Sequence, residues 1–324
     1  MLVLLVTFAV TVAAAPLVRR ILLQRGVIDI PNHRSSHATP VPRGGGIACV
    51  AGVLVGLGVA DSLHGEVPWL AVAGALVLAG VGYADDRWAL GAVLRLGVQI
   101  VVGALIGSTA GGGGWILAGA ILVPVVVNAV NFMDGINGIT SLNMAMWGAL
   151  AMIVGYRGRD VALEVVGAVT VGSALGFLPW NAPVARLFLG DVGSYFFGAF
   201  VAIGIVTGSH LPSEPLLLIA PLSIYLVDTG ASLVRRALRG ESLTTAHREH
   251  VYQRLVNENG FSHLPVAAAT AFLSLVITVA WASGSLLLAG PVTLVVLATY
   301  LASPRVLARV VARGRDSAEG TVDR

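Results

Sequence analysis

The chain has 324 residues, of which 56% are hydrophobic and only 11% are charged, and its mean hydropathy is +0.86. Soluble domains carry about a quarter charged residues, so this composition excludes an ordinary soluble domain and indicates a polytopic membrane protein. All 20 basic residues are arginine, which removes lysine as a base, Schiff-base former or phosphate ligand. The single cysteine, Cys49, excludes a disulfide framework and a cysteine metal cluster.

Apolar stretches of roughly 17 to 20 residues are long enough to cross the hydrocarbon core of a membrane. The first stretch ends in TVAAAP, which resembles a signal-peptide cleavage region, but no basic segment precedes it, so we expect a retained helix. The pattern predicts an all-α polytopic integral membrane protein with about eleven transmembrane helices. The predicted spans are residues 1–18, 47–61, 67–83, 93–109, 115–131, 138–155, 161–178, 194–209, 214–234, 264–282 and 285–302.

The arginines predict how these spans are oriented. If Met1 lies outside, every arginine except Arg157 and Arg159 falls in a cytoplasmic segment, in agreement with the positive-inside rule. The N-terminus is then outside and the C-terminus is cytoplasmic. We expect a single transmembrane domain over 1–302, with its functional loops on the cytoplasmic face, followed by a basic cytoplasmic tail over 303–324.

Five aspartates lie near the ends of predicted spans, and the orientation places them at or close to the cytoplasmic face. An aspartate at the centre of a transmembrane helix costs about 2.5–3.5 kcal/mol, so unpaired aspartates are better placed at the interface. Each has a structural alternative as a solvated helix cap, and Asn128 and Asn131 have the alternative of hydrogen-bonding between helices. Their gathering at one face favours a shared site. The five are Asp85, Asp86, Asp134, Asp191 and Asp228.

Phosphoryl transfer suits this combination of side chains. Carboxylates at a wet interface are ligands that Mg2+ prefers, with substrate phosphates completing its coordination. Arginines bind diphosphates bidentately, and the glycine-rich strings RGGG (43–46) and GDVGS (190–194) let backbone N–H groups approach phosphate oxygens. The sequence contains no P-loop pattern, so ATP hydrolysis is not supported.

Five strings, in order along the chain, resemble the polyprenyl-phosphate N-acetylhexosamine-1-phosphate transferases. This group of glycosyltransferase family 4 includes phospho-N-acetylmuramoyl-pentapeptide transferase. The resemblance covers about residues 29–263. The strings are DIPNHRSSHATPVPRGGG (29–46), DDRWAL (85–90), NAVNFMDGINGI (128–139), FLGDVGS (188–194) and RRALRGESLTTAHREHVYQRL (235–255).

The resemblance implies transfer of a sugar 1-phosphate from a UDP-sugar to a polyprenyl phosphate, with UMP released and Mg2+ required. It implies Mg2+ ligation by Asp191 and Asp134, with Mn2+ as an alternative ion, and makes Asp85 the candidate if a general base is used. The implied catalytic residues are Asp85, Asp86, Asp134 and Asp191. The implied substrate-binding residues are Asn32, Arg34, Ser36, His37, Arg43, Asn128, Asn131, Asn181, His247, Arg248 and His250.

Two features depart from the family pattern. Ala89 stands where a third aspartate often follows the pair, so a site with three carboxylates is not expected. The last string reads HREH and lacks consecutive histidines. Together with VYQRL, it is more similar to the branch that initiates O-antigen and amino-sugar glycans than to the muramoyl-pentapeptide branch, which remains the alternative. The sugar and the prenyl chain length stay open.

The expected partners are a UDP-N-acetyl amino sugar, a polyprenyl phosphate and the lipid bilayer of the bacterial inner membrane, with a homodimer allowed and no nucleic acid. Two other classes of protein remain as alternatives. A transporter would place its polar groups near the membrane midplane on broken helices, whereas here they gather at one face. A binding protein for lipid-linked sugars would use the same residues without turnover.

Overall fold

The computed structural model describes residues 1–31, 39–210, 214–242 and 248–322. Within these ranges the chain is helical apart from short connections and a two-stranded antiparallel ladder, in which Ile28 pairs with Pro42. The elements are α1 (Leu2–Gln24), β1 (Ile28–Asp29), β2 (Val41–Pro42), α2 (Gly46–His64), α3 (Trp69–Trp88), α4 (Ala92–Ser108), α5 (Gly113–Met133), α6 (Ile139–Gly158), α7 (Val161–Asn181), α8 (Gly190–Thr207), η1 (Gly208–His210), α9 (Glu214–Ile219), η2 (Ala220–Leu222), α10 (Ser223–Leu238), α11 (Val251–Asn257), α12 (His263–Ala282) and α13 (Leu286–Val322).

The helices confirm the prediction of an all-α polytopic membrane protein. In the described part of the chain, ten helical segments are long and apolar enough to cross a membrane, with Pro215–Leu238 counted as one segment. Helix α4, which corresponds to the span predicted over 93–109, is shorter at 17 residues. Large apolar side chains such as Val93 on α4 and Leu287 on α13 are exposed, which suits helices that face lipid.

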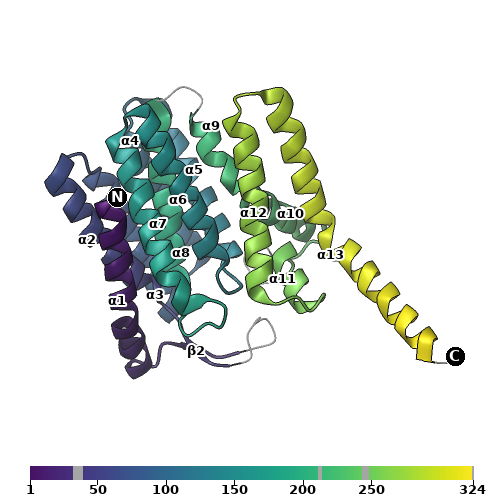
Figure 1. Ribbon diagram of the computed structural model, residues 1–324. Helices are drawn as coiled ribbons and strands as arrows, with labels where there is room; N and C mark the ends of the chain where they lie inside the picture. The colour runs from purple at the N-terminus through teal and green to yellow at the C-terminus, as the bar shows by residue number, and fades with distance from the viewer. Residues whose placement is uncertain (32–38, 211–213, 243–247, 323–324) are drawn as a thin grey trace.

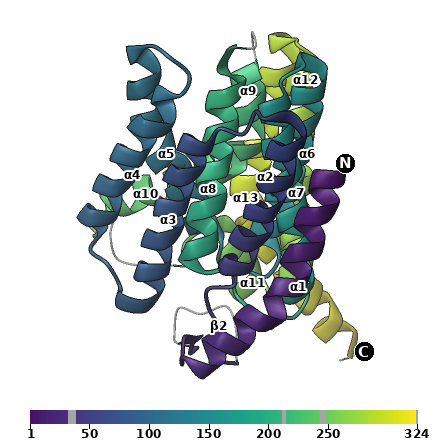
Figure 2. The ribbon, with the colours of Figure 1, turned by 90° about the vertical axis from the view of Figure 1, so that its left-hand side faces the viewer.

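Helix α8 lies at the centre of the bundle (Figures 1 and 2). Nearly all of its side chains are buried. Helix α3 approaches it closely through Gly82, where a Cβ atom would lie 2.2 Å from the carbonyl oxygen of Asp191. Helix α2 does so through Gly46, whose Cβ would lie 2.2 Å from the Cα atom of Gly193. These close contacts bring the C-terminal end of α3 and the N-terminal ends of α2 and α8 together at one end of the bundle.

The span predicted over 214–234 is not one continuous helix. Helix α9 ends at Ile219, a 3-10 turn follows over Ala220–Leu222, and α10 begins at Ser223. Pro221 lies in this turn. Because proline has no backbone N–H to donate, it interrupts the hydrogen bonding of a continuous helix here. A broken helix inside a membrane needs neighbours to satisfy its backbone, and the Trp147 indole donates to the Leu218 carbonyl at 2.9 Å.

The last four helices form a second layer beside the bundle (Figure 1). Helix α12 packs against α6 and α13, and the short helix α11 packs against α12 and α13. Helix α13 runs unbroken from Leu286 to Val322 and its end projects away from the bundle (Figure 1). Residues 303–322, predicted as a basic tail, are therefore helical, while the division of the chain at residue 302 stays a prediction.

Candidate active site

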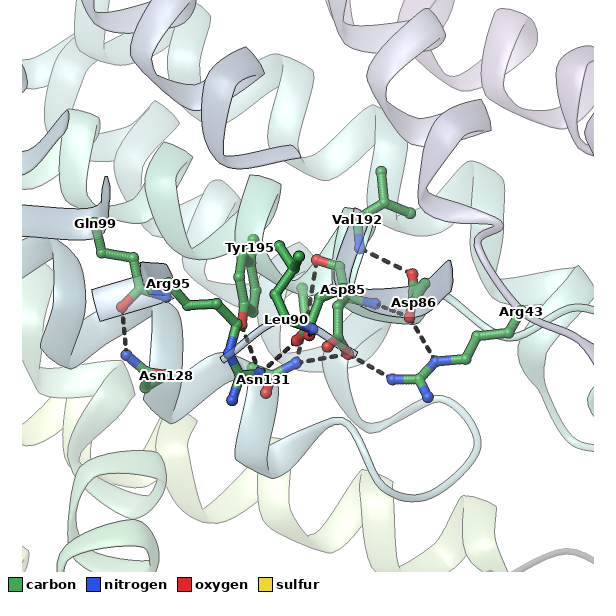
Figure 3. A network of polar contacts seen from close by, with 12 residues as sticks. Arg43, Asp85, Asp86, Leu90, Arg95, Gln99, Asn128, Asn131, Val192 and Tyr195 are labelled. Carbon is green, nitrogen blue, oxygen red and sulfur yellow. Dashed lines mark hydrogen bonds and ion pairs between the residues drawn. The ribbon is translucent and has the colours of Figure 1, made fainter. Parts of the chain in front are cut away.

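Arg43 connects two of the predicted aspartates (Figure 3). Its Nε lies 2.6 Å from Oδ1 of Asp86 and its Nη2 lies 2.6 Å from Oδ1 of Asp191. The backbone holds this arginine in place, because Gly44 and Gly45 donate hydrogen bonds to the Phe188 carbonyl at 3.2 and 2.8 Å. The RGGG string is thus bound to the segment that leads into Asp191, and the arginine that follows β2 faces the ends of α3 and α8.

Asp86 caps the N-terminus of α8. Its Oδ1 accepts a hydrogen bond from the backbone N–H of Asp191 at 3.0 Å, and its Oδ2 accepts one from Val192 at 3.2 Å. The first N–H groups of a helix lack partners within the helix and favour an anion, which explains why a carboxylate is stable in this buried position. Gly190 precedes the cap with a φ of +75°, a conformation that favours glycine.

Asp191 lies in the first turn of α8 and reaches α5. Oδ1 accepts a hydrogen bond from Nδ2 of Asn131 at 3.0 Å, and the same amide donates to the Ser194 hydroxyl at 3.0 Å. The Asp191 carboxylate also lies against the carboxylate of Asp85. Asp191 is thus in contact with α3, α5 and Arg43, and only 9% of the residue is exposed.

Asp85 lies between Arg95 and Asp86 in the network (Figure 3). Oδ1 accepts the backbone N–H of Leu90 at 2.7 Å, and Oδ2 forms an ion pair with Nη1 of Arg95. Arg95 also lies 3.3 Å from the hydroxyl of Tyr195 on α8. Since both oxygens of Asp85 have partners, its first role is to hold Arg95 beside α8, and use as a base requires that one of these bonds be released.

Asp134 directly follows α5. Burial raises the pKa of its carboxyl to about 7; a hydrogen bond with Thr140 opposes this rise and the negative charge of Asp191 adds to it. The two carboxylates therefore repel each other, and a cation bound by both would relieve this repulsion. In the described part of the chain, no three ligating side chains are close enough to hold a metal alone, but Mg2+ needs only one or two carboxylates when phosphates supply the rest. Asp191 and Asp134 fit that requirement.

A cleft of about 290 Å³ opens beside this network. Its wall is formed by β1, by the turn that precedes it and by the end of α3. Arg43 and Asp86 line it together with Asp29 and Arg87. The cleft places charged groups of both signs next to the Arg43 ion pairs, so a ligand in it would contact the network directly.

The last predicted string reaches the same end of the bundle through α11. Tyr252 donates its hydroxyl to the Phe132 carbonyl at 2.8 Å, one residue beyond Asn131. The His250 ring is buried and stacks on Tyr252 with ring centroids 5.7 Å apart, and it lies 6.3 Å from the ring of Phe132. Arg248 is exposed. The other loop residues of the prediction lie outside the described residues: Asn32, Arg34, Ser36, His37 and His247.

Two asparagines predicted to bind substrate form hydrogen bonds within the protein. Asn128 donates to the Gln99 side chain at 2.7 Å and to the Pro124 carbonyl at 2.8 Å, so it joins α4 to α5. Asn181 accepts the backbone N–H of Gly138 at 2.6 Å and donates to the Leu187 carbonyl. These contacts support the structural alternative for Asn128 and give Asn181 the role of fixing the loop that follows Asp134. Substrate contact by either residue stays a prediction.

Sequence reasoning did not identify Arg95, Tyr195 or Ser194 as part of the network. A signal for Arg95 was present, because an arginine at the start of a predicted span requires an acidic partner or an interfacial position. Tyr195 and Ser194 follow Asp191 by four and three residues, which places all three on one face of a helix. The helix start at Gly190 therefore predicts that Ser194 and Tyr195 lie beside Asp191 on α8.

The fold and this site together define a class of protein: a multi-pass helical membrane protein with a buried network of carboxylates and arginines at one end of the bundle. The sequence profile of glycosyl transferase family 4 matches residues 68–209. Curated bacterial proteins match over most of their length. A decaprenyl-phosphate N-acetylglucosaminephosphotransferase of Mycobacterium leprae is 30% identical over 286 residues, covering 73% of this chain and 71% of the relative.

The protein of the same name from Mycobacterium tuberculosis is 29% identical over 350 residues, covering 88% of this chain and 86% of the relative. An undecaprenyl-phosphate alpha-N-acetylglucosaminyl 1-phosphate transferase of Escherichia coli is 27% identical, covering 75% of this chain and 72% of the relative. The chain belongs to the polyprenyl-phosphate N-acetylhexosamine-1-phosphate transferases of glycosyl transferase family 4. The resemblance seen in the five strings is confirmed.

Proposed function

We propose that this protein transfers N-acetylhexosamine 1-phosphate from a UDP-sugar to a polyprenyl phosphate, releasing UMP and forming a polyprenyl diphosphate sugar at the cytoplasmic face of the membrane. One observation carries the proposal. Arg43, Asp86, Asp191 and Asn131 come from four separate segments, and hydrogen bonds and ion pairs join all four directly. The names of the relatives support the acceptor lipid and the sugar class.

The reaction needs a centre that neutralises a diphosphate and holds two phosphates in line. Arg43 suits the first task, because its two ion pairs use only part of the five N–H donors of a guanidinium. The geometry of the site is fixed by three further residues. Asp86 holds the start of α8. Asn131 orients Asp191, and Arg95 orients Tyr195. Preorganised charges of this kind supply most of the stabilisation in phosphoryl transfer.

Mg2+ is the ion that this donor set favours. When bound, it would neutralise the diphosphate of the nucleotide sugar, and Asp191 and Asp134 are the residues that would hold it. The mutual repulsion of the Asp191 and Asp134 carboxylates, which a cation would relieve, supports this assignment. Mn2+ has the same preference for carboxylate oxygens and is the alternative ion.

No general base is required by this proposal. The attacking phosphate of a polyprenyl phosphate is largely ionised near neutral pH, since the second pKa of a phosphate monoester is about 6. Asp85 is bonded to Arg95 and Leu90, which agrees with a reaction in which Asp85 does not act as a general base. A phosphate oxygen attacks the sugar-bearing phosphorus, and the bond to the UMP oxygen breaks.

Asp191→Asn tests the proposal. Removing this charge should lower the rate of UMP release by on the order of 100-fold or more, because a proposed ligand of the Mg2+ that would neutralise the diphosphate is lost. Membranes containing the full chain are supplied with undecaprenyl phosphate, Mg2+ and UDP-N-acetylglucosamine, and UMP is measured. Glu66→Gln, which removes an exposed charge in the connection between α2 and α3, is the control and should retain full activity.

Two results would contradict the proposal. A wild-type protein that releases no UMP from any nucleotide sugar would leave the transporter and the binding protein as the remaining classes. Turnover by Asp191→Asn close to that of the wild type would remove Asp191 from the metal site. A panel of UDP-sugars in the same assay, with UDP-N-acetylglucosamine first because three relatives carry that sugar in their names, identifies the donor.

A further inference from the structure

Asp228 is a predicted interface aspartate whose hydrogen bonds lie outside the network of Figure 3. It lies on α10, after the break at Ala220–Leu222, and is fully buried. An ionisable side chain in a membrane-spanning segment is costly and is retained where it has partners and a task. The partners of Asp228 are therefore informative.

Three groups from two other elements surround the Asp228 carboxylate. The backbone N–H of Val251, the first residue of α11, lies 3.0 Å from each of the two oxygens. The hydroxyl of Tyr300 on α13 donates to Oδ2 at 2.8 Å, and Nδ1 of His250 lies 3.5 Å from Oδ1. Asp228 thus ties α10, α11 and α13 together at a single buried point.

The short helix α11 depends on such an anchor. It has seven residues, which is too few for a helix to be stable alone in water. The side chain of its N-cap residue, His250, makes no capping hydrogen bond to the first N–H groups of the helix. A carboxylate at the start of a helix supplies the missing hydrogen-bond acceptor, and its negative charge interacts favourably with the helix dipole. Further bonds between this segment and α10 run from Arg235 and Arg239 to Glu249. Arg239 is half exposed, so water weakens its ion pair.

The segment that Asp228 anchors, residues 248–250 and the start of α11, lies against the end of α5. The ring of His250 stacks on Tyr252, and Tyr252 donates to the Phe132 carbonyl, between Asn131 and Asp134 in the chain. A shift of α11 would therefore move Arg248 and His250 and would release the end of α5 at the same time. Asp228 itself, fully buried and surrounded by its own donors, has no free path to a substrate.

We propose that Asp228 is a positioning residue for the nucleotide sugar: it holds the segment 248–250 over the end of α5, so that the donor substrate is bound, without touching the substrate itself. This inference rests on the proposed transferase activity. Tyr300 supports Asp228 from α13. The hydrogen bonds of Asp228 go to Val251 and Tyr300 and not to Arg43, Asp86 or Asp191, so its role is confined to the position of this segment.

The kinetic test compares Asp228→Asn and Tyr300→Phe with the wild type in the full chain. For Asp228→Asn the KM for the UDP-sugar should rise on the order of tenfold, because a hydrogen bond to a charged group is lost, while the KM for polyprenyl phosphate stays unchanged. Tyr300→Phe should shift the same constant in the same direction by less. Thr229→Val is the matched control: it is the adjacent buried residue, its hydroxyl has no hydrogen-bond partner within the described ranges, and both constants should stay at wild-type values.

A second measurement does not depend on activity. Arg248 is exposed, so the rate of trypsin cleavage after it reports how firmly the segment is held, and the fragment that begins at Glu249 is identified by mass. Asp228→Asn should produce this fragment faster than the wild type and Thr229→Val should not. The proposal is overturned if Asp228→Asn leaves the cleavage rate unchanged, or if both substrates lose affinity equally. A wild-type protein without transferase activity contradicts the proposed function, and the cleavage comparison still decides whether Asp228 anchors the segment.

Discussion

The carboxylate of Asp86 accepts the backbone N–H of Asp191 at 3.0 Å. One aspartate of the site therefore fixes the position of another through the backbone, and not only through shared charge. Because Arg43 pairs with both side chains at 2.6 Å, the three residues form a closed triangle in which a change at one corner disturbs the other two. This relationship determines what substitutions at the site should do.

Asp86→Asn should inactivate the enzyme by displacing the start of α8. An asparagine presents an amide N–H group where the carboxylate accepts bonds from Asp191, Val192 and Arg43, so at least one donor loses its acceptor, at a cost of about 1–3 kcal/mol. We expect UMP release to fall on the order of 100-fold and the thermal midpoint to fall as well. Asp61→Asn, a charge removal at the opposite end of α2, should change neither, and a stable, active Asp86→Asn protein would contradict the capping role.

Arg95 and Asp85 should behave as a unit. Arg95→Gln frees the carboxylate of Asp85 and removes the partner of Tyr195, so we expect a clear loss of UMP release, with part of the activity kept in Arg95→Lys because the charge remains. Asp85→Asn should cause a similar loss. The double variant should lose less than the sum of the two, with a coupling free energy of about 0.5–3 kcal/mol. Additive losses would show that the two residues act separately.

The gathering of Asp85, Asp86, Asn131 and Asp191 could be predicted from the sequence. Each lies at the end of an apolar stretch, and the distribution of arginines sends all of these ends to one face of the membrane. Length and hydropathy were sufficient for the helices, because in a membrane the backbone must satisfy its own hydrogen bonds within each span. The class of fold and the members of the site thus follow from local properties.

The contacts within the site could not be predicted in the same way. That Asn128 bonds to Gln99, and not to the network, depends on how α4 and α5 are rotated about their axes. That Asp228 faces Val251 and Tyr300 depends on the break at Ala220–Leu222, which an uninterrupted run of apolar residues does not reveal. Rotation and breaks arise from packing between helices, and the sequence of one span contains little information about its neighbours.

The contact between α3 and α8 should be intolerant of a single methyl group. In Gly82→Ala the new Cβ would lie 2.2 Å from the carbonyl oxygen of Asp191, and backbone cannot move aside as a flexible side chain does. We expect a destabilisation of about 1–3 kcal/mol and loss of UMP release. Gly80→Ala, two residues earlier on the same helix with no atom within 4 Å of the new Cβ, should retain stability and activity, so a loss in both variants would point to helix insertion and not to the contact.

The dependence on Mg2+ should itself depend on pH. Burial raises the pKa of Asp134 to about 7, so below that pH the carboxyl is mostly protonated and Mg2+ must displace a proton. The Mg2+ concentration for half-maximal UMP release should therefore rise about tenfold for each pH unit below 7 and level off above about 8. Asp134→Asn has no such proton to displace, so its requirement should be higher but flat across this range. The measurement is a Mg2+ titration of UMP release from pH 6 to 8.5 for both proteins. A wild-type Mg2+ requirement that does not change with pH would remove Asp134 from the metal site and leave Asp191 as its only carboxylate ligand.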